Sequence, residues 1–352
     1  MTEQPLRVGL IGAGGNMRER HMPGFRAIPG VEVVTVANRT PESSQAFAEE
    51  WNIPRIAENW GAVIDDEQVD AVCIGTWPYM HAPITIAALE AGKHVLCEAR
   101  MALNSVEAHR MLDVARAHPG QVAQIVPAPL TFAFDPTVME MIAAGEIGEV
   151  IAVDARIAAG SAFPDQDSPA HWRHDRTLSG NNIMSMGIWY ESLIRWVGPA
   201  RTVQAVGQAV VNHRRNAQGR RVAMTIPDYV DITGELEQGG QLRMCVTTVA
   251  GHAPAPVDIL VYGTRGTLQL YQPPGGVMEL LAGRKGEQGL KPVPIDPAKR
   301  GDWRVEQDFV DAIRTGTPVT LTDFATGVHY MEWTDAVTQS LRGAGRVSLP
   351  LR

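Results

Sequence analysis

Residues 8–17 read VGLIGAGGNM, a short apolar strand that leads directly into a glycine-rich turn ahead of a helix. Gly12 allows a tight turn, and Gly14 lets the backbone come close to a pyrophosphate, whose charge would lie at the N-terminus of the helix. Met17 stands where a third glycine is usual. The pattern predicts a dinucleotide site, with a purely structural turn as the alternative. The residues predicted to hold the dinucleotide here are Gly12, Gly14, Gly15, Asn16 and Met17.

The sequence on either side of this turn predicts two domains. From Leu6 to about Val126, short β-branched runs alternate with helical spacing, which indicates an α/β Rossmann domain with a doubly wound parallel sheet. After Gly148 the strands are longer and joined by short turns, which predicts an α+β domain with an open, mainly antiparallel sheet. The predicted boundaries are 1–126 for the dinucleotide-binding domain and 127–352 for a substrate-binding and oligomerisation domain, whose closing helix at 323–341 could pack back on the first domain.

Composition and charge exclude several classes of protein. The 352 residues carry 31 Lys and Arg against 39 Asp and Glu, a formal net charge of −8, so the basic surface that nucleic acid binding needs is missing. The three cysteines are widely separated, and we expect neither a disulfide framework nor a cysteine zinc site. With no export leader and no apolar run of about 20 residues, we expect a cytoplasmic protein without a membrane segment.

The second strand ends at Asn38-Arg39-Thr40, where an acidic residue would bind the ribose 2′-hydroxyl of NAD. Asn38 carries no charge to repel a 2′-phosphate, and Arg39 and Thr40 can bind one. NADP is therefore favoured over NAD as the cofactor. The alternative is that Arg39 only stacks on the adenine, which leaves the choice between the two cofactors open.

Four further segments carry a resemblance to a known family. They are TWPYMH at 76–81, AALEAGKHVLCEARMALN at 87–104, WRHD at 172–175 and GTRGT at 263–267. Over essentially the whole chain the sequence resembles the Gfo/Idh/MocA oxidoreductases, named for glucose-fructose oxidoreductase, inositol 2-dehydrogenase and a rhizopine-catabolism protein. The resemblance implies a Rossmann domain, an open-sheet domain, hydride transfer at a sugar or cyclitol hydroxyl, and a homodimer or homotetramer formed through the second sheet. The resemblance also implies that further residues belong to the cofactor site, namely Thr76, Trp77, His81, Glu98 and Arg100.

Three catalytic positions of the family pattern have lost their titratable groups here. Family members usually carry Glu-Lys-Pro where this chain has Glu98-Ala99-Arg100, and the lysine takes part in proton transfer. A helix of the second domain usually carries an Asp and, four residues later, a His, but here Ser185 and Trp189 stand at those positions. The usual proton-transfer groups are thus absent, and hydride chemistry would need other residues or water.

Three residues near these positions are candidates for the missing role. His174 has a side chain that titrates near neutral pH, with a solvent-facing loop histidine as the alternative. Tyr190 follows Trp189 on the same helix, and a core aromatic is the alternative. Arg100 could polarise a carbonyl or hold an anion, but it stays protonated and cannot act as a base. The predicted catalytic residues are His174, Tyr190 and Arg100.

The second domain also carries groups typical of a sugar site, namely amides, hydroxyls and flat apolar rings. Arg156 and Arg173 suggest a substrate with a carboxylate, sulfonate or phosphate. We expect no metal, because the histidines near Asp175 lack a further well-spaced ligand. Glu191 and Arg195 are expected to form a solvated or interfacial ion pair. The predicted substrate-binding residues are Arg156, Trp172, Arg173, Asn181, Asn182, Ser185 and Trp189.

The sequence leaves three functional hypotheses. The leading one is an NAD(P)-dependent oxidoreductase that acts on a sugar, glycoside or cyclitol hydroxyl, or reduces the keto-sugar, with a non-standard acid/base set. The second is a redox-neutral enzyme with resident NAD(P) that cleaves a glycoside by oxidation, elimination and hydration. The third is a non-catalytic regulator that binds nucleotide and sugar. In each, the expected ligand is a sugar-like small molecule, with neither nucleic acid nor membrane as a partner.

Overall fold

The computed structural model describes residues 4–351, which form two compact units. The first unit contains the chain up to Pro127 and a returning segment, Arg304–Met331. The second contains Ala128–Trp303 and the chain from Glu332 onward. The first unit is therefore discontinuous in sequence, and helix α10 (Phe324–Gln339) contributes residues to both.

The first unit is built on a six-stranded parallel sheet with the order β3-β2-β1-β4-β5-β6. In the centre of the sheet, Leu10 of β1 lies beside Val36 of β2 and Cys73 of β4. The inner residues of β1 are buried without alternation, as in parallel strands covered on both faces. The predicted doubly wound Rossmann sheet is confirmed. The strands are β1 (Leu6–Ile11), β2 (Val31–Ala37), β3 (Arg55–Ile56), β4 (Ala71–Ile74), β5 (His94–Cys97) and β6 (Ala123–Ile125).

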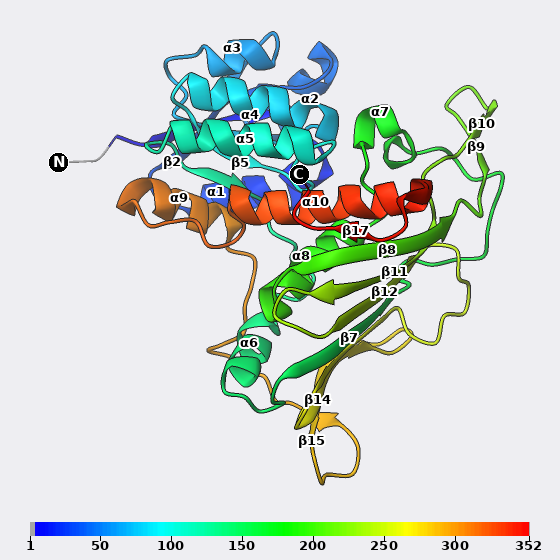
Figure 1. The fold of residues 1–352 in the computed structure, drawn as a ribbon. Coiled ribbons are helices and arrows are strands. Elements are labelled where there is room, and N and C mark those ends of the chain that lie inside the picture. Colours follow the sequence, from blue (N-terminus) through cyan, green and yellow to red (C-terminus); the bar gives the residue numbers. More distant parts are fainter. Residues whose placement is uncertain (1–3, 352) are drawn as a thin grey trace. The chain divides into compact units, whose positions relative to one another are not determined.

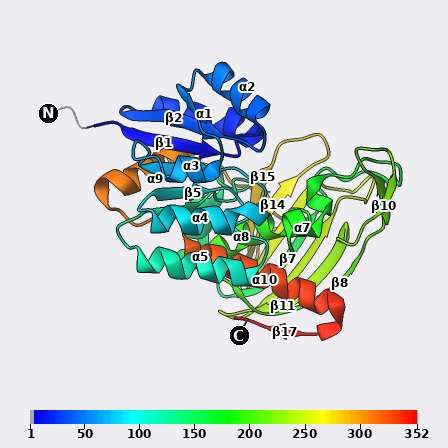
Figure 2. The same cartoon turned by 90° about the horizontal axis from the view of Figure 1, so that it is seen from above.

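Helices pack on this sheet, with α4 and α5 side by side in both views (Figures 1 and 2). Polar side chains cap the backbone donors at helix starts: the Thr40 hydroxyl accepts from the Ser43 N–H in α2, and the Asn104 amide oxygen accepts from the Glu107 N–H in α5. The helices of this unit are α1 (Met22–Ala27), α2 (Pro41–Trp51), α3 (Trp60–Ile64), α4 (His81–Glu90), α5 (Ser105–Ala117), α9 (Val305–Thr315) and the first half of α10.

The second unit contains a nine-stranded sheet with the order β16-β15-β14-β13-β7-β12-β11-β8-β17. Neighbouring strands are antiparallel except β7 and β12, which run parallel, so the predicted mainly antiparallel sheet is confirmed. The strands are β7 (Val150–Ile157), β8 (Ala200–Gln208), β11 (Tyr229–Leu236), β12 (Gln241–Thr247), β13 (Val257–Gly263), β14 (Gly266–Gln272), β15 (Glu279–Arg284), β16 (Lys291–Pro292) and β17 (Val347–Ser348), with a separate hairpin of β9 (His213–Arg215) and β10 (Arg221–Ala223).

One face of the second sheet is buried and the other is exposed. Along β7, Val153 and Ala155 are buried while Arg156 is exposed, because successive side chains point to opposite faces. On the exposed side, Val206 of β8 has 74% of its surface in solvent. The helices of this unit are α6 (Asp135–Ala143), α7 (Arg176–Ser179), α8 (Met186–Val197) and the end of α10. No helix within residues 4–351 is long and apolar enough to cross a membrane.

Candidate active site

A cleft of about 560 Å³ lies at the carboxyl ends of β1, β2 and β4 in the first unit. The strand order of the sheet reverses between β1 and β4, and such a reversal leaves a crevice in which nucleotides bind. The cleft is lined by the glycine-rich turn, by the loop that begins at Asn38, by Trp77 after β4 and by residues 58–60.

The glycine-rich turn has the backbone geometry that a pyrophosphate requires. Gly12 has a φ of +79°, and a Cβ there would lie 2.6 Å from the backbone nitrogen of Thr76, so only glycine fits. A Cβ on Gly14 or Gly15 would meet nothing within 4 Å. The turn thus leaves open space in front of the N–H groups that begin the next helix.

Met17 does not line the cleft. Its side chain is buried, and its sulfur lies 3.8 Å from the Cys73 thiol in the core of the unit. A Cβ on Gly75 would come within 2.9 Å of the Met17 methyl group. Met17 therefore fills the space between the turn and β4, whereas the predicted role was contact with the dinucleotide.

Asn38 fastens the glycine-rich turn to the end of β2. Its amide oxygen accepts from the Ala13 N–H at 2.6 Å, and its amide nitrogen donates to the carbonyl oxygens of Ala13 and Ser43 at 3.2 and 3.1 Å. The side chain thereby satisfies backbone groups that would otherwise face the cleft without a partner. Asn38 therefore holds the glycine-rich turn in shape. The side chains that can bind a ligand here come from the next two residues, Arg39 and Thr40.

Arg39 and Trp77 form the adjoining wall of the cleft. The Arg39 guanidinium lies over the Trp77 ring, 4.9 Å from its centre, a cation–π contact that orients the guanidinium. The Thr40 hydroxyl caps the N-terminus of α2. This helix N-terminus lies beside the cleft, because Thr40 and Ser43 both line it. A guanidinium and a helix N-terminus both stabilise negative charge.

A buried histidine lies between two carboxylates next to the turn. His21 is 3.0 Å from the Glu98 carboxylate and 2.5 Å from that of Glu306, and Asn16 donates a further hydrogen bond to Glu98. Burial opposes charge on His21, but the two carboxylates outweigh it and raise its pKa to about 9. The same contacts lower the pKa of Glu98 despite its burial. A Cβ on Gly24 would lie 2.4 Å from the Glu306 carboxylate, so the glycine makes room for this network.

His81 and Arg100 join two loops of the same unit. The His81 ring nitrogens lie 2.9 Å from the carbonyl oxygens of Thr76 and Arg100. Burial lowers the pKa of His81, so the ring is neutral and donates its one proton to one of these two carbonyls. The Arg100 side chain is also buried. The geometry gives His81 a positioning role toward Thr76, which lines the cleft.

In the second unit, a short 3-10 turn, Trp172–His174, carries three of the predicted residues. Nδ1 of His174 accepts from the His171 N–H at 3.0 Å, and Nδ1 of His171 accepts from the Arg173 N–H at 3.3 Å. Each neutral ring therefore carries its proton on Nε2. The Arg173 guanidinium lies 4.3 Å from the centre of the Trp172 ring.

His174 is half-buried and carries no charge at neutral pH. Burial, reinforced by Arg214 and His171, lowers its pKa to about 4, although Asp228 acts in the opposite direction. Its Nε2–H is a hydrogen-bond donor, so in this state the ring can donate a hydrogen bond to an oxygen atom but cannot accept a proton at Nε2.

Tyr190 lies in the core of the second unit. Only 1% of its surface is exposed, and its ring stacks on Trp333 with 4.0 Å between centroids and an angle of 6°. Its hydroxyl oxygen accepts from the Ala200 N–H at 2.8 Å. Burial raises the pKa of the phenol above its ordinary value. This environment favours the core role and not the predicted catalytic one.

The predicted substrate residues of the second unit lie in different environments. Asn181 donates to the Asp335 carboxylate at 2.8 Å and Asn182 donates to the Ser179 carbonyl at 2.6 Å, so both hold the loop before α8. Ser185 is the half-exposed N-cap residue of that helix, and Trp189 is buried. Arg156 points to the exposed face of the sheet, so the structure does not bring it together with the buried Trp189.

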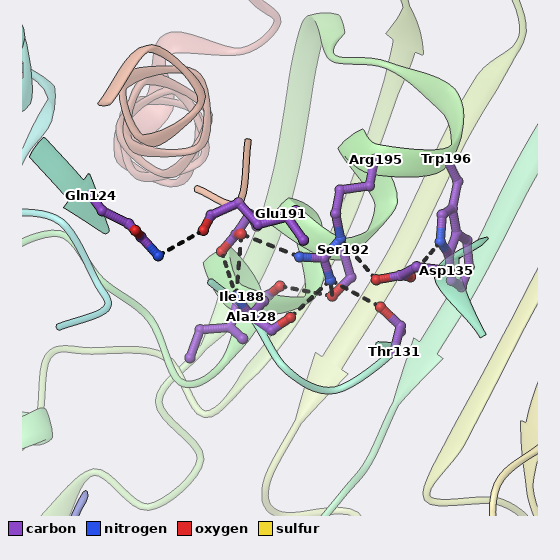
Figure 3. A network of polar contacts seen from close by, with 10 residues as sticks. Gln124, Ala128, Thr131, Asp135, Ile188, Glu191, Ser192, Arg195 and Trp196 are labelled. Carbon is purple, nitrogen blue, oxygen red and sulfur yellow. Dashed lines mark hydrogen bonds and ion pairs between the residues drawn. The ribbon is translucent and has the colours of Figure 1, made fainter. Parts of the chain in front are cut away.

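Glu191 and Arg195 form a buried network, which corrects the prediction of a solvated or interfacial pair. The Arg195 side chain, 8% exposed, contacts the carboxylates of Asp135 at 3.0 Å and Glu191 at 3.4 Å, and it donates to the Ala128 carbonyl at 2.8 Å (Figure 3). Glu191 accepts from the Ala128 N–H, and Asp135 accepts from the Trp196 indole. The i,i+4 spacing correctly predicted that the two side chains pair. Their burial could not be predicted locally, because the partners come from residues 128–135.

Comparison with known proteins identifies the family. Residues 6–125 match the family described as "Oxidoreductase family, NAD-binding Rossmann fold", and residues 136–269 match the "GFO/IDH/MocA C-terminal domain". The 1,5-anhydro-D-fructose reductase of Ensifer adhaerens is 30% identical over 300 residues, which cover 83% of this chain and 84% of the relative. The chain belongs to the Gfo/Idh/MocA oxidoreductase family.

Two further comparisons extend over nearly the whole chain. Levoglucosan dehydrogenase of Pseudarthrobacter phenanthrenivorans is 25% identical over 395 residues, with 99% of each chain covered. A solved structure of levoglucosan dehydrogenase in complex with NADH and levoglucosan has a TM-score of 0.84 at 24% identity and covers 99% of this chain and 100% of that chain. The chain therefore shares the fold of levoglucosan dehydrogenase.

Several residues of this Gfo/Idh/MocA protein were not singled out from its sequence. His21 lies one helical turn beyond Met17, which is a weak local signal, but its partner Glu306 is 285 residues away and leaves none. Residues 58–60 reach the cleft through a loop without a motif. Arg214 belongs to an arginine-rich hairpin, and that composition could have marked it. Within residues 4–351 no cluster of His, Cys, Asp and Glu could hold a metal ion.

Proposed function

We propose that this protein is an NAD(P)-dependent oxidoreductase that acts on a hydroxyl group of a sugar, glycoside or cyclitol, or reduces the corresponding keto-sugar. The observation that carries the proposal is the cleft at the strand-order reversal, where a Cβ on Gly14 or Gly15 would meet open space. Relatives named levoglucosan dehydrogenase and 1,5-anhydro-D-fructose reductase support a sugar as the substrate.

The residues present fit a dinucleotide. The N–H groups after Gly14 would hold the pyrophosphate, while Trp77 and Arg39 flank the region beyond the end of β2. When bound, the nicotinamide accepts or supplies the hydride. Asn38 holds the turn in place, and the neutral His81 holds the loop that carries Thr76.

We propose NADP as the preferred cofactor. No carboxylate stands at position 38 to repel a 2′-phosphate, and the Arg39 guanidinium lies next to the N-terminus of α2. Glu58 also lines the cleft and is the acidic group that would oppose this preference. Removing Arg39 should therefore weaken NADPH binding much more than NADH binding, and Glu58→Gln should leave the preference for NADPH intact or increase it.

For the proton, we propose that His174 donates a hydrogen bond from Nε2 to the reacting or a neighbouring oxygen of the substrate. A neutral imidazole with its proton fixed on Nε2 suits the reductive direction, in which a carbonyl is polarised. Ala99, Ser185 and Trp189 offer no titratable group. That absence favours a second candidate function, a regulator that binds nucleotide and sugar without turnover.

The cofactor is tested by titrating NADPH and NADH into the protein and following the change in nucleotide fluorescence. The expected result is binding of both with tighter NADPH, a loss of about 10-fold or more in NADPH affinity for Arg39→Ala, and little change for NADH. Arg55→Ala is the matched control, because Arg55 pairs with Asp66 and lies outside the cleft lining. Binding of neither nucleotide would refute the proposed function.

Turnover separates the remaining candidates. A panel of sugars and keto-sugars with NADP⁺ or NADPH should give a change in nicotinamide absorbance if the protein is an oxidoreductase. Product formation at constant absorbance would indicate the redox-neutral glycosidase, and cofactor binding without any product would indicate the regulator. A homodimer or homotetramer through the exposed sheet face, which carries Val206, is the proposed assembly and is checked by light scattering.

A further inference from the structure

Three loops of the second unit lie at one end of its large sheet. Strands β7, β8 and β12 run in the same direction, since β12 is parallel to β7 and both β8 and β12 are antiparallel to β11. They end at Ile157, Gln208 and Thr247, so the loops that follow them begin at the same end of the sheet. Figure 1 shows the β9–β10 hairpin and α7 at this end.

The hairpin is fastened to the loop that carries the His171–His174 turn. The Gln166 side chain donates to the Val210 carbonyl at 2.9 Å and accepts from the His213 N–H at 3.3 Å. Arg215 exchanges backbone hydrogen bonds with this loop, donating to Ser168 at 3.0 Å and accepting from Ala170 at 2.7 Å. The Arg214 side chain also donates to the Ser168 hydroxyl. These bonds fix Arg214 beside the turn.

The turn itself presents only donors. Nδ1 of both His171 and His174 already accepts a backbone N–H, so both neutral rings direct an Nε2–H outward. No described residue is bonded to either Nε2. Arg173, stacked on Trp172, adds a guanidinium next to the two rings.

Positive charge at this end of the unit is not matched by nearby carboxylates. Arg176, Arg214 and Arg342 have no ion pair with any described carboxylate, and burial, reinforced by Arg342, lowers the pKa of Arg176. Asp228 accepts from the N–H groups of Val210 and Val211, and Asp175 accepts from Thr177. Asp167 pairs with Arg215 of the hairpin, so these carboxylates leave Arg214 without a counterion, and such a charge favours an anion.

We propose that Arg214, Arg173 and the Nε2–H of His171 bind an oxyanion carried by the substrate beside the oxygen that His174 contacts, so that the substrate is an acidic sugar derivative. A carboxylate and a phosphate offer the same acceptor oxygens and the same sign of charge, and either is suited to two guanidinium groups and an N–H donor. This inference rests on the proposed function only in calling the ligand a substrate. The anion site itself lies wholly within the second unit.

The site is tested by calorimetric titration of the full chain, without cofactor and at low salt, with D-glucuronate, D-glucose 6-phosphate, D-glucose and inorganic phosphate. We expect at least one acidic sugar to bind about 10-fold or more tightly than glucose, and the order of the two acidic sugars identifies the carboxylate or the phosphate. Arg214→Gln should weaken the acidic sugar by about 10- to 100-fold and glucose by less than about 2-fold. Arg214→Lys keeps the positive charge but loses the paired N–H donors of the guanidinium, so its affinity for the acidic sugar should lie between those of the wild type and Arg214→Gln.

The matched control is Arg220→Gln, which removes the same charge from the same hairpin at an exposed position. Equal losses for Arg214→Gln and Arg220→Gln would mean a diffuse electrostatic effect and would overturn the proposal. So would glucose binding as tightly as both acidic sugars, or no binding of any anion.

A second readout does not depend on a sugar. The imidazole resonances of His174, assigned with His174→Gln, should titrate near pH 4 in the free protein and at higher pH when inorganic phosphate is bound, because the anion stabilises the protonated ring. No shift with phosphate would count against the site. Cofactor binding measured on the same samples separates the two proposals. Loss of anion selectivity while a nucleotide still binds refutes this inference alone. Anion selectivity with neither NADPH nor NADH bound refutes the proposed function alone.

Discussion

Replacing Tyr190 with Phe separates the core role of this residue from a catalytic one. The variant keeps the ring that stacks on Trp333 and removes only the hydroxyl oxygen that accepts from the Ala200 N–H. Ala200 is 2% exposed, so its N–H would be left buried without a partner, which costs about 1–3 kcal/mol. For a unit of this size each kcal/mol lowers the thermal midpoint by about 2–4 °C.

The assay is thermal unfolding followed by near-UV circular dichroism, together with kcat on the best sugar substrate. We expect a midpoint lower by several degrees, NADPH affinity unchanged, and kcat within a few-fold of the wild-type value. Tyr262→Phe is the control, because Tyr262 lies 36% exposed on β13 and its change should cost no more than about 0.5 kcal/mol.

The opposite pattern would refute this reasoning. A true proton donor or acceptor contributes about 100-fold or more, so a kcat loss of that size at an unchanged midpoint would return Tyr190 to the catalytic set. Equal midpoints for Tyr190→Phe and Tyr262→Phe would show that the bond to Ala200 contributes nothing to stability.

Three other expectations follow from polar side chains that hold each unit together. The pKa of His21 is about 9 in the folded state against 6.5 in the unfolded chain, so its protonation stabilises the fold by about 3 kcal/mol below pH 6.5, and this stabilisation is lost as the pH rises toward 9. Urea unfolding across this pH range should show the free energy of unfolding decline. In His21→Gln the free energy of unfolding should depend less on pH. Arg195→Met should cost about 3–5 kcal/mol by leaving Asp135 and Glu191 without their cation, and adding Asp135→Asn should recover part of the loss in a double-mutant cycle; additive losses would contradict the network. Asn38→Ala should weaken NADH and NADPH about equally, since it loosens the turn they share, and a loss confined to NADPH would contradict that role.

Local sequence patterns were sufficient for the sheet classes and for the nucleotide cleft. A glycine turn, its strand and its helix are neighbours in sequence, so Gly12, Gly14 and Arg39 could be placed from spacing alone. The same holds for the two sheets, because unbroken apolar runs and alternating ones differ in period. Even the departure at Ala99 was visible without coordinates.

The packing of several predicted residues depends on contacts between distant segments, which the sequence does not show. Tyr190 is stacked on Trp333, and Arg195 is buried against Ala128 and Asp135, none of which lies within one helical turn. Met17 was assigned by its position in a motif, whereas the size of its side chain and the gap beside Gly75 determine that it packs inward. Residue type and spacing indicate the face of a helix or strand on which a side chain lies. They do not indicate which distant residues pack against that face.

The contacts of the returning segment impose an order on how this protein is made. His21 and Met101 are synthesised well before Glu306 and Tyr330, which hold them. A nascent chain of the first 127 residues would therefore hold a buried imidazole with only one of its two carboxylates. We expect the first unit to stay open to proteases until residues 304–331 have been synthesised, while the segment Ala128–Trp303 can already begin to fold. A chain terminated before residue 304 should be degraded, and a permuted chain that begins at Arg304 should give the first unit its partners from the start.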